Sequence, residues 1–186
     1  NFSSEYPGSV SIFLKDIINL SKFKNFVNIY GYTKFKKKLS KNYINLNFKK
    51  KILLSNTKQY LSKFIQKTSN KNIKILEIHN RPRYVKSLLK YYKNIVLYYH
   101  NDPITQKGSE KVSERMYLVE NLKFIIFNSN WTKKRFLSNL KLPLKLKKKL
   151  LVIHQSTNKT NVNLLNKKKI ITFIGKLNTS KGYDLF

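Results

Sequence analysis

Short apolar runs recur along the chain, and amphipathic segments with helical spacing separate them. The runs predict strands at 26–31, 73–78, 95–99, 123–127, 150–153 and 169–175. The amphipathic segments predict helices at 11–23, 58–67, 84–92 and 109–121, and a further helix capped by Ser129. Apolar strands that alternate with such helices are typical of a parallel sheet covered on both faces. We therefore predict an α/β fold with a doubly wound parallel sheet.

Two segments differ in how clearly their boundaries are marked. Residues 36–51 alternate apolar and polar positions between lysine clusters, which suits either a half-exposed edge strand or a long surface loop. The sequence does not decide between these two. The helix at 109–121 is better marked, because Ser109 is a suitable N-cap and acidic residues occupy the first turn.

Polar side chains follow the apolar runs directly. They are His79, Asn80, His100, Asn101, Asp102, Asn128, Ser129 and His154, and they include all three histidines of the chain. In doubly wound sheets, ligands bind outside the carboxyl ends of the strands. We therefore expect these residues to form the floor of a cleft. The competing explanation is that loops are polar in general and that Asn and Asp only cap the next helix.

Length and composition fit one domain with a sizeable core. The chain has 186 residues, of which 41% are hydrophobic, and it contains no cysteine. Disulfides, thiolate zinc sites and a cysteine nucleophile are thereby excluded, and a reducing compartment, the cytoplasm, is expected. No apolar run approaches the roughly 20 residues that a membrane-spanning helix needs.

The net charge of +31 admits two explanations. A strongly basic chain often binds nucleic acid or an anionic membrane surface, and the basic segments 34–51 and 133–151 would then do so. However, only four of the 39 basic residues are arginine, a bias that AT-rich codons also produce. A dedicated phosphate-binding protein usually relies on arginine forks as well as lysine charges, so biased composition on a solvated surface is the preferred explanation.

Several common chemistries lack their motifs. The chain has five glycines and contains no Gly-x-Gly-x-x-Gly, no Walker-type loop and no Gly-x-Ser-x-Gly. Its histidines do not show the short spacing of metal ligands, so we predict no metal site. Dehydrogenase, P-loop and α/β-hydrolase functions are therefore disfavoured.

Taken together, the strand-end motifs resemble those of GT-B glycosyltransferases of the retaining, nucleotide-sugar-dependent family 4. The motifs are 78-IHNRP-82, 99-YHNDP-103, 126-IFNSNWTKKRF-136, 152-VIHQST-157 and 173-FIGKLNTSKGYDL-185. The resemblance implies an acceptor-side Rossmann-like domain at 1–165 and the start of a donor-binding domain at 166–186. It also implies that the chain is truncated at both ends, because the first strand and the donor domain's acidic pair are missing, and that this fragment alone is inactive.

The resemblance also assigns residues. His100 matches the histidine that faces the donor sugar, and it is the catalytic candidate. The donor diphosphate would be bound by Gly175, Lys176 and Lys181, with Gly8 in a loop that approaches phosphate, although lysine stands at 176 where the family usually has arginine. The acceptor or cleft residues would be His79, Asn80, Asn101, Asp102, Glu114, Arg115, Asn128 and Ser129. The Glu114–Arg115 pair could hold the His100 loop or reach an acceptor, or be an ordinary helical charge pair.

The implied activity is transfer of a sugar from a nucleotide diphosphate sugar, without metal or other cofactor, to a glycan or lipid-linked acceptor. Such a reaction belongs to cell-surface polysaccharide or lipopolysaccharide synthesis, and the expected location is the cytoplasm or the inner face of the cytoplasmic membrane. The alternative is a basic module that binds a membrane surface, or less readily nucleic acid, without catalysis.

Overall fold

The computed structural model describes residues 2–48, 55–155 and 184. The helices and strands described below lie in a first compact unit that ends at Gln155. The predicted strand at 169–175, the predicted domain boundary after residue 165, and the candidates Gly175, Lys176 and Lys181 fall outside the described residues.

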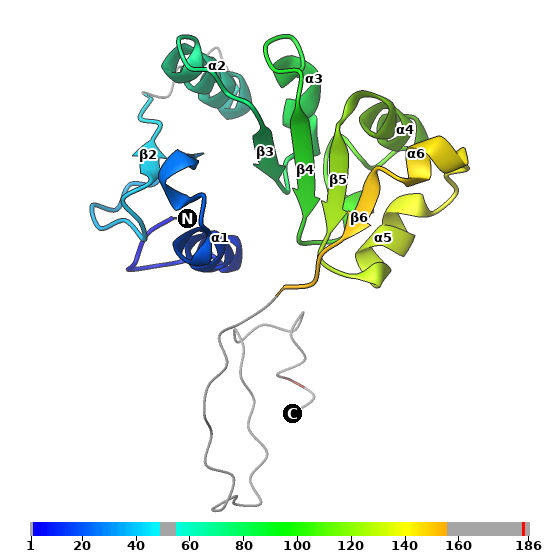
Figure 1. Cartoon of the computed structure of the whole chain (residues 1–186), viewed down its shortest axis with the longest axis horizontal. Coiled ribbons are helices and arrows are strands. Elements are labelled where there is room, and N and C mark those ends of the chain that lie inside the picture. The colour runs from blue at the N-terminus through cyan, green and yellow to red at the C-terminus, as the bar shows by residue number, and fades with distance from the viewer. Residues whose placement is uncertain (1, 49–54, 156–183, 185–186) are drawn as a thin grey trace, which may run out of the picture. The chain divides into compact units, whose positions relative to one another are not determined.

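A four-stranded parallel sheet organises this unit (Figure 1). Its strands are β3 (Leu76–His79), β4 (Ile95–Tyr99), β5 (Phe124–Phe127) and β6 (Leu150–Val152), and they lie side by side in chain order. The strand predictions are confirmed here, although β3 begins at Leu76 instead of residue 73. Because all four strands are parallel, their carboxyl ends meet along one edge of the sheet.

A separate pair of parallel strands precedes this sheet. It consists of β1 (Ile29–Gly31) and β2 (Tyr43–Asn45). The uncertain segment 36–51 therefore contains a short strand, and its remaining residues as far as 48 form no further strand. The strand predicted at 26–31 begins later, at Ile29, and its predicted first residue, Phe26, is the last residue of a 3-10 turn, η1 (Lys24–Phe26).

The helices follow the predicted order with some changes in length. They are α1 (Ser9–Leu20), α2 (Asn56–Thr68), α3 (Val85–Leu88), α4 (Val112–Asn121), α5 (Asn130–Leu137) and α6 (Leu144–Lys147), with 3-10 turns η2 (Pro82–Tyr84) and η3 (Pro103–Thr105). The helix expected at 84–92 is only four residues long. Beyond Leu88 the chain continues as a turn at residues 89–91, in which the Tyr91 N–H donates to the carbonyl three residues back, that of Leu88, at 2.9 Å. Val85 and Leu88 are nevertheless buried as the periodicity predicts.

The N-cap predicted for α4 is wrong. Ser109 is fully buried, and its hydroxyl donates to the Pro103 carbonyl at 2.6 Å, so it closes the loop before the helix. The N-cap residue of α4 is Lys111, whose backbone N–H donates to the Glu114 carboxylate at 3.0 Å.

The two faces of the sheet are covered to different extents, because on the face that carries Tyr98 only β4 is fully buried, while Glu77 and Leu151 are exposed. All five residues of β4 are buried. Leu97 and Tyr99 belong to the main hydrophobic core, together with residues of α2, α4 and α5. Tyr98 projects to the opposite face, where the ring of Phe13 from α1 meets it edge-on at 5.4 Å. The chain is therefore an α/β protein with a parallel sheet, as predicted, while full cover on both faces and the strand order that defines a doubly wound sheet are not visible in the described strands.

Candidate functional site at the carboxyl ends of the strands

Four side chains from three strand ends form one continuous chain of hydrogen bonds. Glu77 Oε1 lies 2.8 Å from His79 Nε2, and His79 Nδ1 lies 2.9 Å from His100 Nε2. At the other end, Gln155 Nε2 lies 2.8 Å from His100 Nδ1. Glu77 and His79 belong to β3, His100 follows β4, and Gln155 follows β6. The parallel register therefore brings together residues that are far apart in sequence.

The two ends of this chain fix the direction of every hydrogen bond in it. An ionised Glu77 can only accept, and the Gln155 amide nitrogen can only donate. A neutral imidazole has one donor and one acceptor nitrogen. His79 therefore donates to Glu77, His100 donates from Nε2 to His79, and Gln155 donates to His100. The result is a defined tautomer of His100, in which Nδ1 is the acceptor.

The electrostatics of the site agree with this assignment. Burial lowers the pKa of His100 to about 4, the neighbouring His79 adds to that effect, and Glu77 opposes it. Burial by itself would raise the pKa of Glu77, but the hydrogen bond from His79 and the electrostatic interaction with its ring outweigh burial, and the pKa lies below its ordinary value. At neutral pH, Glu77 is therefore ionised and His100 is neutral.

Aromatic rings hold His100 on two sides. The Tyr98 ring stacks on the imidazole with centroids 4.4 Å apart and an interplanar angle of 10°. Phe13 of α1 meets the same imidazole edge-on at 4.9 Å. These contacts leave the imidazole little freedom to rotate, so its nitrogens point in fixed directions.

Two asparagines fix the backbone of His100. The Asn80 side-chain oxygen accepts from the His100 N–H at 2.8 Å, and Asn128 Nδ2 donates to the His100 carbonyl at 2.9 Å. Asn80 has a positive φ of 51°, which aims its side chain back towards β4. The structure thus brings His79, Asn80, His100 and Asn128 together, as the sequence predicts.

Other candidates at this edge support the loops. Asp102 accepts from both Nε and Nη2 of Arg135 at 3.0 and 2.9 Å, and from the backbone of Ile104. Ser129 caps α5 by accepting from the Thr132 N–H at 3.2 Å, which confirms the predicted cap. Asn101 is exposed directly after His100. Asp102 and Ser129 therefore stabilise the loops at the carboxyl edge of the sheet through hydrogen bonds to other residues of the protein.

The Glu114–Arg115 pair acts inside the fold. Arg115 is almost completely buried, and its guanidinium donates to the carbonyls of Ser109, Glu110 and Ser138. Glu114 accepts from the backbone N–H that precedes α4. Of the roles considered from the sequence, holding the loop after His100 is the one that these contacts provide.

Gly8 is the N-cap residue of α1, with φ −82° and ψ 153°. Its carbonyl accepts the first hydrogen bonds of the helix, from Ser11 and Ile12. This conformation is open to any residue, so it does not require glycine.

Sequence reasoning missed two members of the site. Gln155 stands in the motif 152-VIHQST-157, and its contact with His100 spans 55 positions. Phe13 lies in the helix predicted at 11–23, where its apolar spacing indicates only a buried helix face. Both depend on packing between distant segments, which spacing along the chain does not reveal.

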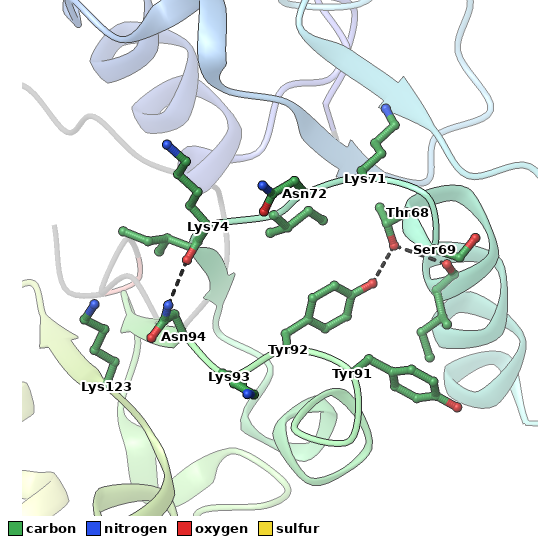
Figure 2. A pocket seen from close by; sticks show the side chains of 13 residues that line it. Thr68, Ser69, Lys71, Asn72, Lys74, Tyr91, Tyr92, Lys93, Asn94 and Lys123 are labelled. Carbon is green, nitrogen blue, oxygen red and sulfur yellow. Dashed lines mark hydrogen bonds between the residues drawn. The ribbon is translucent and has the colours of Figure 1, made fainter.

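Another hollow in the described part of the chain lies elsewhere, beside the residues that precede β3, β4 and β5 (Figure 2). It has a volume of about 850 Å³, and Lys71, Lys74, Lys93 and Lys123 border it. This is the amino-terminal edge of a parallel sheet, whereas ligands of such sheets bind at the carboxyl edge. We therefore place the candidate site at the histidines.

Comparisons of the chain with protein-family models, with curated proteins and with solved structures gave no match. In the segments that the structure describes, every helix is too short or too polar to cross a membrane.

Proposed function

We propose that this chain is the acceptor-side domain of a retaining glycosyltransferase, which transfers a sugar from a nucleotide diphosphate sugar to a hydroxyl of a glycan or lipid-linked acceptor. The observation that supports the proposal is the position of His100 at the carboxyl edge of the sheet, where two rings and two asparagines hold it. The strand-end motifs that resemble family 4 enzymes provide the second support.

His100 has a specific role in this proposal. The Nδ1 atom of His100 is an acceptor, and Gln155 donates to it. The Gln155 side chain is exposed and follows β6. A hydroxyl of the transferring sugar would replace Gln155 and donate to Nδ1. His79 and Glu77 act through His100 as positioning residues, because they keep the proton on Nε2. Gly175, Lys176 and Lys181 would stabilise the leaving diphosphate, as the resemblance implies.

The test is sugar transfer by the complete protein that carries this chain. With a panel of common nucleotide sugars, we expect one donor to bind and to be consumed in an acceptor-dependent reaction. Replacing His100 by alanine should lower kcat/KM about 100-fold, which is typical of losing one fixed hydrogen bond in a transition state. Asn70→Ala, in the exposed turn after α2, is the matched control and should leave the rate unchanged.

Two results would contradict the proposal. One is the absence of binding and transfer with every donor in the panel. The other is a His100→Ala enzyme as active as the wild type, because the fixed geometry around His100 would then serve no step of the reaction.

The alternative of a basic binding module receives less support. Two lysines of the segment 133–151 bind within the fold, since Lys133 Nζ donates to the Leu150 carbonyl and Lys149 Nζ donates to the carbonyls of Val119 and Glu120. These ammonium groups link α5 to β6 and the residue before β6 to α4. Part of the positive charge therefore has a role that needs no external partner.

A further inference from the structure

A small hollow of about 250 Å³ lies next to the histidines. The loop after β3 supplies residues 80–83 of its wall, and the loop after β4 supplies residues 105–107. Three of these residues are cations, Arg81, Arg83 and Lys107, and none of the described lining residues is acidic. All three are exposed, so their charged groups are open to a ligand.

The use of arginine in this chain is informative. Only four of its 39 basic residues are arginine, so lysine serves almost everywhere that a positive charge is sufficient. Two of the four make contacts that lysine could not reproduce. Arg115 donates to three separate carbonyls, and Arg135 binds Asp102 through two nitrogens.

The other two arginines both border the small hollow. Arg81 and Arg83 flank the buried Pro82 at the start of η2. Arg81 Nη1 donates to the Asn80 carbonyl at 2.8 Å, which leaves the rest of its fork without a hydrogen bond to the described protein. The fork geometry of a guanidinium matches the oxygens of phosphate.

A buried acceptor in the same wall needs a donor. Gln106 Oε1 is buried and accepts no hydrogen bond from the described residues. The orientation of this amide is fixed, because Nε2 faces two acceptors, Asn80 Oδ1 at 3.3 Å and the Asn101 carbonyl at 3.5 Å. A hydroxyl group of a bound molecule would satisfy Oε1.

We propose that this hollow binds a phosphate group on a hydroxyl-bearing molecule, with Arg81 and Arg83 on the phosphate oxygens and Gln106 on a neighbouring hydroxyl. Lys107 adds a third positive charge, which favours a doubly charged phosphate over a carboxylate. Asn80 joins this hollow to the histidines, because its Oδ1 accepts from both Gln106 and His100. The phosphate site does not depend on the proposed function. If the chain is an acceptor-side domain, the bound phosphate would belong to the sugar acceptor, and this second step rests on the proposed function.

The test is a titration of the 186-residue chain with inorganic phosphate and with glycerol 1-phosphate, followed by NMR of backbone amides. We expect saturable shifts at Arg81, Arg83 and Lys107. Arg81→Lys and Arg83→Lys keep the charge but lose the fork, so each should weaken binding about 5- to 10-fold. Lys145→Gln, on exposed α6, removes one charge at a distance and is the control, with affinity unchanged.

The hydroxyl contact is tested in the same titration. Glycerol 1-phosphate should bind more tightly than inorganic phosphate, and Gln106→Leu should remove that difference while inorganic phosphate still binds. Shifts that do not saturate, or Arg→Lys variants that bind as tightly as the wild type, would overturn the phosphate site. Equal affinity for the two probes would overturn the role of Gln106. Since neither probe is a sugar donor, failure of sugar transfer would leave the phosphate result intact.

Discussion

Replacing Arg115 by methionine is expected to lower the free energy of unfolding by about 3 to 4 kcal/mol. Arg115 lies buried on α4, and its guanidinium reaches the carbonyls of Ser109, Glu110 and Ser138 at 2.7 to 3.1 Å. Methionine fills a similar volume but leaves these carbonyls without their donor. The effect is measurable by urea denaturation followed by circular dichroism.

Two further variants separate the hydrogen bonds from the charge. Arg115→Lys retains the positive charge but cannot span three carbonyls, so its stability should lie between wild type and Arg115→Met. Lys86→Met, on the exposed side of α3, should change stability by less than about 0.5 kcal/mol. A free energy of unfolding of Arg115→Met within about 1 kcal/mol of the wild-type value would show that the guanidinium does not hold the loop that ends at Ser109 and Glu110.

Gly108→Ala is expected to destabilise the protein by about 3 kcal/mol or more. Gly108 has φ +95°, a conformation that other residues rarely adopt. A Cβ atom there would lie 2.6 Å from the backbone nitrogen of Arg83 and 2.7 Å from its Cα. Because the obstacle is backbone, no side-chain rotation can relieve it.

This close approach is also what joins the loop after β4 to the turn after β3. We therefore expect Gly108→Ala to disturb the amides of Arg83 and Lys107 as well as the unfolding curve. Gly8→Ala provides the control, because Gly8 has an ordinary φ of −82° and should tolerate a Cβ with a change below about 1 kcal/mol. Equal stabilities for the two variants would show that Gly108 does not need its backbone conformation.

The elements that could be predicted are those whose signal is local. Strand β4 was predicted at its observed limits, 95–99, because five consecutive residues are apolar and buried on both faces. The α3 region shows the limit of this signal. Its apolar spacing correctly identified the buried Val85 and Leu88, but spacing did not reveal the turn at residues 89–91 that follows the helix.

The two predicted helix N-caps also show what a local sequence signal can and cannot predict. Ser129 and Ser109 both precede a helix, yet only Ser129 caps one. The Ser109 hydroxyl donates instead to the Pro103 carbonyl, and this hydrogen bond depends on the conformation of the loop before the helix. The convergence of His79 and His100 was predictable because parallel strands must end at one edge. The links to Gln155 and Phe13 were not, since they depend on long-range packing.

The hydrogen bond between the two histidines is open to direct measurement. In a sample with ¹⁵N-labelled histidine at neutral pH, only three imidazoles contribute signals, and the third, His154, serves as the reference. We expect a scalar coupling across the hydrogen bond between His79 Nδ1 and His100 Nε2, with the proton on Nε2 of His100. A spectrum without this coupling, or one with the proton on Nδ1 of His100, would contradict the arrangement on which the proposed sugar site depends.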